Sequence, residues 1–324
     1  MGSGPAVLVT GAAGYVGRLC VAALAKRRDE LSTLVALDWV DTEPEDRLEG
    51  VVYEQDDICD PGLKDLFRTH GIDTVVHLAS IVRAPKGAPK DLAYRVDVLG
   101  TKNVLAACEA VNAKRLIVTS SGAAYGYHAD NPEWLDEEDP LRGNDEFEYS
   151  KHKRIVEEML AEWRALRPEL RQVVFRPGTI VGEDVHSPVT DLFEKPVILG
   201  IIGSNSPFVF IWDQDLVACI VDAVFSEKVG VYNQAGDGAL TPREIARMLD
   251  KPYLQLPASV VAAVLWGLKR LGLTENGPER VNFLRYRPVL SNRRLKEEYG
   301  FVPKLTSREA FELYARARGL LASA

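Results

Sequence analysis

The chain has 324 residues, of which 46% are hydrophobic and 27% are charged, and its formal net charge is -8. This length and composition are typical of a globular protein with a large core, long enough for one α/β domain and a smaller lobe. The acidic balance and the lack of a Lys/Arg-rich block argue against a nucleic-acid partner.

The cysteines and apolar runs bear on the compartment. Cys20, Cys59, Cys108 and Cys219 are widely spaced, without a CxxC pair or a Cys/His cluster, so we expect reduced thiols and no metal site. No export signal is visible, and the longest apolar run, 258–268, is too short to cross a bilayer. We expect a cytoplasmic protein with no membrane partner, and we interpret the apolar run as a lid or interface helix.

The first predicted elements are a strand, a glycine-rich turn and a helix. The stretch AVLVTGAAGYVG at 6–17 begins with β-prone residues and continues into apolar residues at helical spacing. Gly11, Gly14 and Gly17 then lie in the turn, where they allow a tight bend and the approach of the backbone to a pyrophosphate. Glycines spaced in this way also occur in ordinary turns, so the following elements decide the interpretation.

The next predicted strand ends in an acid. LSTLVALDW at 31–39 places Asp38 about 20 residues after the glycine turn. An acid in this position bonds the adenosine ribose hydroxyls and repels a 2′-phosphate. The order strand, turn, helix, strand, acid therefore favours dinucleotide binding, with NAD preferred over NADP.

The remaining pattern predicts a doubly wound parallel sheet of Rossmann type. Up to about residue 170, apolar strands alternate with amphipathic helices. Further strands are expected at 51–60, 73–80, 113–122 and 171–178, with helices at about 92–111 and 149–166, and a surface loop at 125–147. Beyond residue 182 the pattern is shorter, with helices near 215–225, 242–249, 258–271, 292–299 and 307–317.

We divide the chain by expected role. Residues 1–180 form the NAD-binding domain and carry the catalytic residues, whereas residues 181–324 form mainly a substrate-binding lobe, and some of their segments return to the first domain. Ligands of open α/β sheets bind beyond the carboxyl ends of the strands. The smaller lobe is therefore expected to border that edge.

Three polar residues suggest the chemistry. Tyr149 and Lys153 in YSKHK are four residues apart, which places them on one face of a helix. A lysine ammonium near a phenol stabilises the phenolate, and the same lysine can hold the nicotinamide ribose. Ser121 follows the strand at 113–122 and can bond a substrate oxygen. An isolated YxxxK is usually just a surface pattern, but the three together are the minimum for hydride transfer between a secondary alcohol and NAD.

The ordered motifs resemble those of the extended short-chain dehydrogenase/reductases of the NAD-dependent epimerase/dehydratase type. The matching segments are TGAAGYVG, DDIC, HLAS, TSSGAAYG, YSKHK, FRPGTIVG, FIWDQDLVACI and VYNQAGDGALTPREIA. The resemblance implies cofactor contacts from Thr10, Gly11, Tyr15, Val16 and Gly17 at the pyrophosphate, Asp57 and Ile58 at the adenine, Leu78, Ala79 and Ser80 along the cofactor, and Arg176, Pro177, Gly178 and Thr179 at the nicotinamide end, besides Tyr149 and Lys153. It also implies a homodimer formed through the helices at 100–111 and 149–166.

Departures from the family pattern narrow the chemistry. Gly122 and Ala123 stand where sugar-nucleotide dehydratases have an Asp-Glu pair, so dehydration is disfavoured. Asp97 stands where the family commonly has Asn, so we expect an altered or charged hydrogen bond there.

The expected phosphate-binding arginine is also missing. Pro207 and Phe208 occupy the region where nucleotide-sugar epimerases usually carry an Arg that grips the diphosphate. Arg287, Arg293 and Arg294 could compensate, whereas an aromatic cluster of Phe208, Phe210 and Trp212 suits either a less charged substrate or a simple core. The candidate substrate contacts are Ser121, Gly122, Ala123, Phe208 and Arg287.

Three functions remain open. The missing arginine tilts the prediction toward an NAD-dependent dehydrogenase/reductase of a secondary alcohol or ketone, with Tyr149 as acid/base. A nucleotide-sugar 4-epimerase that retains its NAD is the alternative. A non-catalytic NAD-sensing module is the third, and the intact Ser121, Tyr149 and Lys153 argue against it.

Overall fold

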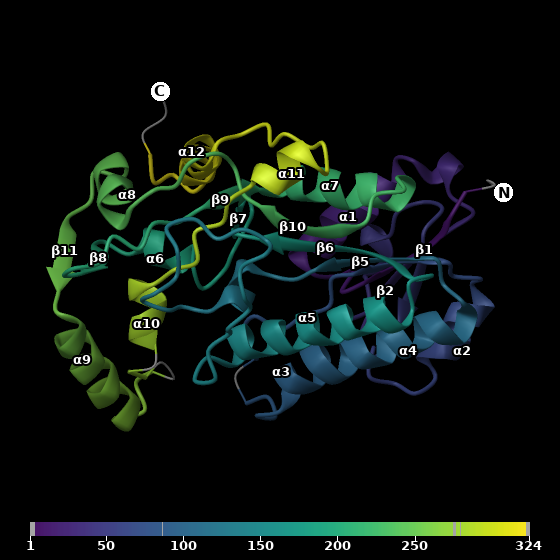
Figure 1. The fold of residues 1–324 in the computed structure, drawn as a ribbon, viewed down its shortest axis with the longest axis horizontal. Coiled ribbons are helices and arrows are strands. Elements are labelled where there is room, and N and C mark those ends of the chain that lie inside the picture. Colours follow the sequence, from purple (N-terminus) through teal and green to yellow (C-terminus); the bar gives the residue numbers. More distant parts are fainter. Residues whose placement is uncertain (1–3, 86, 275–276, 279, 322–324) are drawn as a thin grey trace. The chain divides into compact units, whose positions relative to one another are not determined.

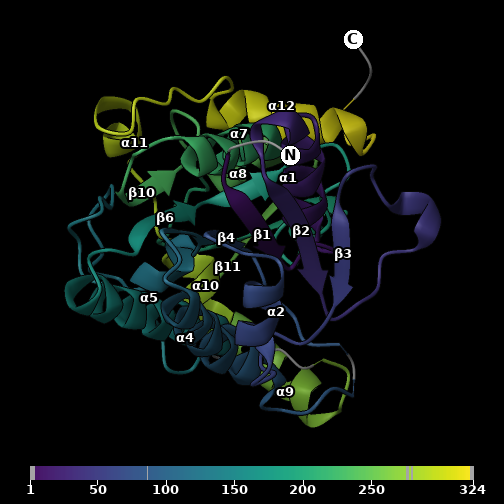
Figure 2. The same ribbon diagram turned by 90° about the vertical axis from the view of Figure 1, so that its right-hand side faces the viewer.

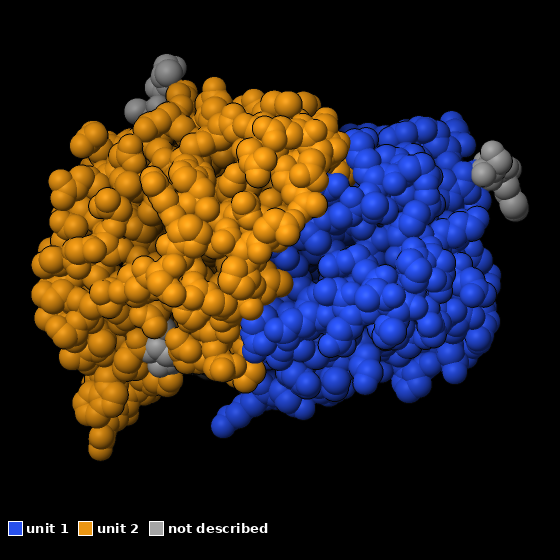
Figure 3. All heavy atoms as spheres, viewed as in Figure 1, with its two compact units in different colours: residues 1–121, 152–176, 214–232 blue, residues 122–151, 177–213, 233–324 orange. Residues whose placement is uncertain are grey.

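The computed structural model describes residues 4–85, 87–274, 277–278 and 280–321. The chain forms two compact units, coloured separately in Figure 3. Unit 1 comprises residues 1–121, 152–176 and 214–232, and unit 2 comprises residues 122–151, 177–213 and 233–324. The expected functional division at residue 180 assigns a role to each part and stays a prediction.

Unit 1 is built on a seven-stranded sheet with the order β10-β6-β5-β4-β1-β2-β3. Strands β1 to β6 pair in parallel with their neighbours. The strands are β1 (Ala6–Thr10), β2 (Thr33–Asp38), β3 (Val52–Gln55), β4 (Thr74–His77), β5 (Arg115–Thr119), β6 (Arg171–Pro177) and β10 (Gly230–Gln234). The predicted doubly wound parallel sheet is confirmed, and β10 is an edge strand that the sequence did not indicate.

Helices cover both faces of this sheet (Figures 1 and 2). Their bounds are α1 (Tyr15–Ala25), α2 (Leu63–Thr69), α3 (Leu92–Tyr94), α4 (Thr101–Val111), α5 (Glu148–Leu166) and α7 (Asp213–Phe225). Apolar side chains of α2, α4 and α5 share one core cluster with β1, β2, β4 and β5, while α1 and α7 lie on the other face. The helix expected at 92–111 is present, but a π-helical turn over Arg95–Gly100 joins α3 to α4.

The strand order places a topological switch point between β1 and β4. From β1 the chain continues outward through β2 and β3, and from β4 it continues in the other direction through β5 and β6. Thr10 and His77 are register partners at the ends of β1 and β4. The glycine turn after β1 therefore lies where open α/β sheets bind their ligands.

Unit 2 contains two small parallel sheets, β11-β8 and β7-β9. Its elements are β7 (Thr179–Val181), β8 (Ile198–Ile201), β9 (Phe210–Trp212), β11 (Tyr253–Leu256), α6 (Asp191–Glu194), α8 (Pro242–Met248), α9 (Ala258–Arg270), α10 (Arg280–Arg285), α11 (Arg293–Glu297) and α12 (Ser307–Ala317). Thr241 and Thr306 begin α8 and α12 with capping boxes, in which the third helical residue is Glu244 or Glu309. The helices predicted beyond residue 182 are confirmed, and α6 and α10 were not foreseen.

Aromatic rings form the core of unit 2. Phe208 and Phe210 are buried and stacked, with 5.7 Å between ring centroids. Phe193 of α6 and Phe311 of α12 meet edge to face at 5.1 Å, and Phe193 contacts both stacked rings. Phe208 and Phe210 therefore belong to a packed core. Of the two interpretations of the aromatic cluster, this favours a simple core over a surface for a less charged substrate.

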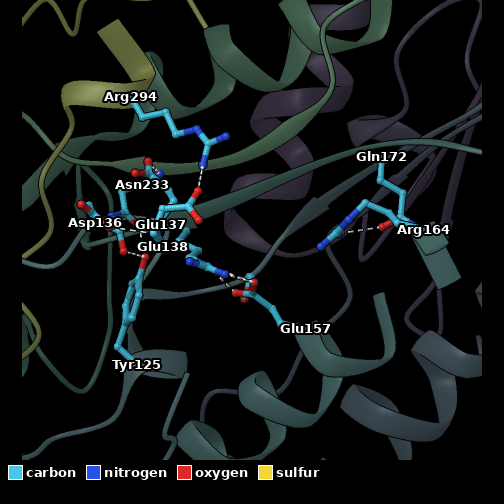
Figure 4. A network of polar contacts seen from close by, with 11 residues as sticks. Tyr125, Asp136, Glu137, Glu138, Glu157, Arg164, Gln172, Asn233 and Arg294 are labelled. Atoms are coloured by element: carbon cyan, nitrogen blue, oxygen red, sulfur yellow. Dashed lines mark hydrogen bonds and ion pairs between the residues drawn. The ribbon is translucent and has the colours of Figure 1, made fainter. Parts of the chain in front are cut away.

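The irregular segment 125–147 is not the simple surface loop that its acidic composition predicted. Tyr125 and Leu135 are buried. The Tyr125 hydroxyl donates to the Asp136 carbonyl at 2.8 Å and contacts Asn233 Oδ1 at 2.9 Å (Figure 4). Tyr125 thus anchors the segment inside unit 2, because its partner Asn233 is distant in the sequence.

The four cysteines are free and three of them are buried. Burial raises the pKa of the Cys20 and Cys108 thiols to about 12, which makes them poor nucleophiles. Every helix in the described part of the chain is too short or too polar to span a lipid bilayer.

Candidate active site

The glycine turn has the geometry of a phosphate cradle. Gly11 has a φ of +70°, and a Cβ there would lie 2.6 Å from the Ala79 nitrogen. A Cβ on Gly17 would overlap the carbonyl of Gly11. Gly14 caps α1 without a side-chain hydrogen bond, and the first turn, which contains Tyr15 and Val16, has no acid. These residues fit a dinucleotide pyrophosphate at the helix N-terminus.

Asp38 lies beside this turn. Its Oδ2 accepts a hydrogen bond from the Ala13 backbone at 2.9 Å, and its Oδ1 accepts one from Val40 at 3.2 Å. The carboxylate is thus fixed against the glycine turn, in unit 1. This is the position that ribose recognition requires.

Thr10 connects the ends of β1 and β4. Its Oγ1 lies 2.8 Å from His77 Nδ1, and the Ala79 backbone donates to the same Oγ1 at 3.4 Å. The Thr10 carbonyl also accepts from Leu78. His77 is buried and its Nε2 lies 2.9 Å from Thr101 Oγ1, so it is a packed residue.

Three other residues predicted to contact the cofactor, Asp57, Ile58 and Ser80, also belong to unit 1. Ile58 is buried in the core and would block a Cβ on Gly100, while Asp57 is exposed and accepts from the Cys59 backbone at 2.9 Å. Ser80 is partly buried. Their roles toward the cofactor stay predictions.

Asp97, which departs from the family pattern, is a buried charged group. Its Oδ1 accepts from the Ile81 backbone at 2.9 Å, and its Oδ2 lies 3.5 Å from His152 Nδ1. Burial alone would raise its pKa, but His152, the charge of Lys153 and the Ile81 N–H together hold the pKa below its usual value. The altered, charged hydrogen bond expected at this position is therefore present.

Helix α5 carries the Tyr and Lys of the YxxxK pattern one turn apart. Lys153 is buried, and its Nζ donates to the Thr119 carbonyl at the end of β5, 3.4 Å away. Ser150, next to Tyr149, donates to the Ala123 carbonyl at 2.6 Å. The start of α5 is therefore held against the backbone that follows Ser121. Ser121 and Lys153 belong to unit 1 and Tyr149 to unit 2.

A buried ion pair that the sequence did not reveal lies near the ends of β5 and β6. Glu157 of α5 binds Arg176 of β6, with an Nη2–Oε2 distance of 2.7 Å. Glu157 also accepts from Ser120 Oγ at 2.6 Å (Glu157 is labelled in Figure 4). Arg176 thus serves the interior of unit 1, and its expected position at the nicotinamide end stays a prediction.

The other candidates of the FRPGT segment lie in unit 2. Pro177 ends β6. Gly178 donates to the Gln234 carbonyl and Thr179 to the Val209 carbonyl, each at 2.9 Å. A Cβ on Gly178 would lie 2.8 Å from the Val209 side chain, so the close approach of this chain segment requires glycine.

Arg287 is a partly buried cation of unit 2. Its Nη1 donates to the Ser206 carbonyl and hydroxyl at 2.9 and 3.0 Å, and its guanidinium lies 3.7 Å from the centroid of the Phe208 ring. Within the described residues no carboxylate pairs with it, and its Nε is buried without a hydrogen-bond partner. Burial lowers its pKa to about 9. A partly buried guanidinium without a carboxylate partner among the described residues is well suited to an anionic group.

Gly122 and Ala123 are buried as well. A Cβ on Gly122 would lie 2.9 Å from the Leu290 side chain. Whether they touch a substrate stays a prediction. Among the residues that the structure describes, no group of His, Cys, Asp and Glu side chains is arranged to hold a metal ion.

Comparison with known proteins decides the family. The model of the "NAD dependent epimerase/dehydratase family" matches residues 7–200, more than half of the chain. The chain belongs to the NAD-dependent epimerase/dehydratase family. This NAD-dependent epimerase/dehydratase family member is thus an enzyme of the extended short-chain dehydrogenase/reductase class, and the expected cofactor, NAD, is confirmed.

Two individual relatives and one solved structure are also similar to this chain. The chain is 26% identical over 321 residues to protein Rv0501 of Mycobacterium tuberculosis, covering 97% of this chain and 84% of that protein. It is 30% identical over 221 residues to UDP-glucose 4-epimerase of Halalkalibacterium halodurans, covering 65% of this chain and 63% of that enzyme. The structure of Thermus thermophilus UDP-glucose 4-epimerase with NAD superimposes with a TM-score of 0.73 at 24% identity, covering 97% of this chain and 99% of that one, which shows a shared fold.

Proposed function

We propose that this enzyme is an NAD-dependent 4-epimerase of a sugar nucleotide, whose diphosphate Arg287 binds. The observation that carries the proposal is the partly buried guanidinium of Arg287, whose Nε is buried without a hydrogen-bond partner and which has no carboxylate partner among the described residues. Removing part of a cation from water is costly unless an anion compensates it, and a substrate diphosphate supplies one. The similarity to a UDP-glucose 4-epimerase supports the same substrate class.

The structure weakens the argument for a less charged substrate. That argument rested on Phe208, Phe210 and Trp212, but Phe208 and Phe210 are packed against Phe193 in the core of unit 2. The missing arginine near Pro207 still leaves one cation fewer than the epimerase pattern has. A dehydrogenase/reductase of a secondary alcohol or ketone, which the sequence favoured, is therefore our second candidate.

The proposed mechanism uses three side chains. Ser121 donates a hydrogen bond to the reacting substrate oxygen, and Tyr149 removes its proton and later returns it. The ammonium of Lys153, held by the Thr119 carbonyl, stabilises the phenolate form of Tyr149. Bound NAD would supply the hydride acceptor and donor for this exchange. Asp38 and the turn at Gly11, Gly14 and Gly17 hold its adenosine and pyrophosphate ends in this proposal.

The non-catalytic alternative makes a different prediction for Tyr149→Phe. For an enzyme, this variant retains NAD affinity and loses activity by at least about 100-fold, because the proton-transfer group is gone. For an NAD-sensing module the wild type has no turnover to lose. Measurable wild-type turnover that disappears in Tyr149→Phe excludes the sensing module.

The deciding experiment is to denature the purified protein and identify the released small molecules by mass spectrometry. We expect NAD together with a sugar nucleotide. The recovered sugar nucleotide is then incubated with the enzyme, and the formation of its 4-epimer is followed without added cofactor. An empty site that takes up NADH and consumes it with an added ketone would favour the reductase instead.

Arg287→Gln tests the substrate class. Removing the guanidinium is expected to raise the KM for the sugar nucleotide by at least about tenfold and leave NAD affinity unchanged, since in the part of the chain that the structure describes Arg287 has contacts in unit 2, with Ser206 and Phe208. Arg308→Gln, which removes an exposed cation on α12 of the same unit, is the control. An equal KM in both variants would argue against diphosphate binding by Arg287.

We also propose that the protein is a cytoplasmic homodimer. Four free cysteines suit a reducing compartment. The dimer is expected from the family's use of the segments that here form α4 and α5.

A further inference from the structure

Helix α9 carries an apolar outer surface. Val260, Val264 and Trp266 on the helix and Leu271 and Leu273 after it are exposed, which we call the α9 patch. The exposed fractions are 52% for Val264, 56% for Trp266 and 73% for Leu271. Figure 1 shows α9 at one end of unit 2, with α10 beside it. Large apolar side chains gathered in this way on a surface usually mark an interaction site.

The inner side of α9 is already satisfied. Val261 is buried with Ile201 of β8 and Val281 of α10, and Ala262 and Leu265 pack against them. The outer side chains of Val260, Val264 and Trp266 do not belong to this cluster. A helix that is apolar on both sides is expected to be covered on both sides.

The charges of α9 itself are positive. Within α9 the charged side chains are Lys269 and Arg270, without an acid, in a protein with a net charge of -8, and the nearest acids along the chain are Asp250 and Glu275. Lys269 and Arg270 end α9, and the Arg270 guanidinium lies 5.3 Å from the centroid of the Trp266 ring. The apolar surface thus ends in a pair of cations next to an exposed indole.

We propose that the α9 patch docks on the surface of a lipid bilayer that contains anionic phospholipids. Apolar side chains would enter the boundary between headgroups and acyl chains, Trp266 would lie at that boundary, and Lys269 and Arg270 would reach the lipid phosphates. The 13 residues of α9 span only about 20 Å, so the helix lies on the bilayer and does not cross it. Surface docking revises our expectation of no membrane partner for this one helix.

The test uses the full-length protein and lipid vesicles. Vesicles of phosphatidylcholine alone are compared with vesicles of phosphatidylcholine and phosphatidylglycerol, and bound protein is measured by sedimentation. We expect binding to the anionic vesicles that weakens as salt is added. Lys269→Gln and Arg270→Gln are each expected to lower the partition coefficient about fivefold, which corresponds to ~1 kcal/mol per cation.

Two apolar positions test the patch itself. Val264→Asp combined with Leu271→Asp is expected to lower binding by at least about tenfold, because both side chains would enter the bilayer boundary. Val302→Asp is the matched control, since Val302 is an exposed valine of unit 2 outside the patch, with 66% of its surface exposed. Circular dichroism verifies that each variant is folded.

A spectroscopic readout places Trp266 directly. Its emission should shift to the blue when anionic vesicles are added, and Trp266→Phe should remove that shift. No binding of the wild type to anionic vesicles, or binding that Val264→Asp/Leu271→Asp leaves unchanged, would overturn the proposal. So would a dimer in solution that this double variant dissociates, because the patch would then join two copies. None of these measurements needs a substrate, so the result is independent of the proposed epimerase activity.

Discussion

At the scale of single residues, His77 shows how burial fixes a protonation state. Burial lowers its pKa to about 4, and the charge of Lys153 acts in the same direction. Both ring nitrogens already lie at hydrogen-bond distance from threonine hydroxyls, Thr10 Oγ1 and Thr101 Oγ1. His77 is therefore neutral in the folded protein at neutral pH and has a packing role at the end of β4.

This burial predicts a pH dependence of stability. Between pH of about 6.5, the ordinary value for histidine, and pH of about 4, the unfolded chain binds a proton at His77 that the folded protein does not. The free energy of unfolding should thus fall as the pH drops through this window, by up to roughly 3 kcal/mol from this residue. His77→Gln should be less stable at neutral pH but should lose less stability in the window, as measured by urea unfolding.

The control for this slope is His186→Gln, since the His186 side chain is exposed. It should retain the wild-type slope. A wild-type slope in His77→Gln would mean that other groups cause the acid sensitivity.

Asp38 predicts the choice of cofactor. NAD should bind the wild type at least about tenfold tighter than NADP, because the carboxylate beside the glycine turn repels a 2′-phosphate. Asp38→Asn keeps an oxygen for the Ala13 N–H but removes the charge, so the ratio of NAD affinity to NADP affinity should fall. Calorimetry with both cofactors measures the ratio, and Asp65→Asn, an exposed carboxylate on α2, is the control. Comparable affinities of the wild type for the two cofactors would contradict the role of Asp38.

At the scale of elements, the ion pair of Glu157 and Arg176 joins α5 to β6. A hydrogen bond from Ser120 to Glu157 also joins α5 to the end of β5. Glu157→Gln would leave the buried Arg176 guanidinium without its counter-charge. We expect the free energy of unfolding to fall by about 3 kcal/mol, measured by chemical denaturation.

The neighbouring residue provides the control. Glu158 forms an exposed pair with Arg154 on the same helix, so Glu158→Gln should change stability by less than about 0.5 kcal/mol. If the two variants lose equal stability, the buried pair does not hold these elements together.

Elements with long, regular patterns could be predicted from the sequence. The strands β1 to β6 and helices such as α12 are formed by apolar residues at clear spacing. The three-residue strands β7 and β9 could not, because so short a run has no measurable period. β10 joins the edge of the sheet from more than 50 residues beyond β6, and pairing over such a distance leaves no local signal.

The same distinction holds for the candidate site. Gly11, Asp38, Tyr149 and Lys153 belong to motifs whose spacing carries their chemistry. The partners Glu157 and Arg176 are 19 residues apart on different elements and meet only in the fold. Arg287 was one of several candidate arginines, and its partial burial without a carboxylate partner among the described residues distinguishes it.

At the scale of the whole molecule, the family resemblance predicts a homodimer through α4 and α5. Ala106 on α4 and Ala161 on α5 are exposed. Small side chains allow helices to approach closely, so an arginine at either position would obstruct the contact. Ala106→Arg and Ala161→Arg are therefore expected to convert a dimer into a monomer, measured by light scattering at micromolar concentration.

Ala263→Arg separates this surface from the α9 patch. Ala263 is an exposed alanine on α9, and its replacement adds the same bulk and charge to a different helix. The variant should remain dimeric, because α9 lies outside the expected contact. A wild type that is monomeric at this concentration would refute the dimer, whereas a dimer broken only by Ala263→Arg would place the contact on α9 and would also remove the patch from the surface available to lipid.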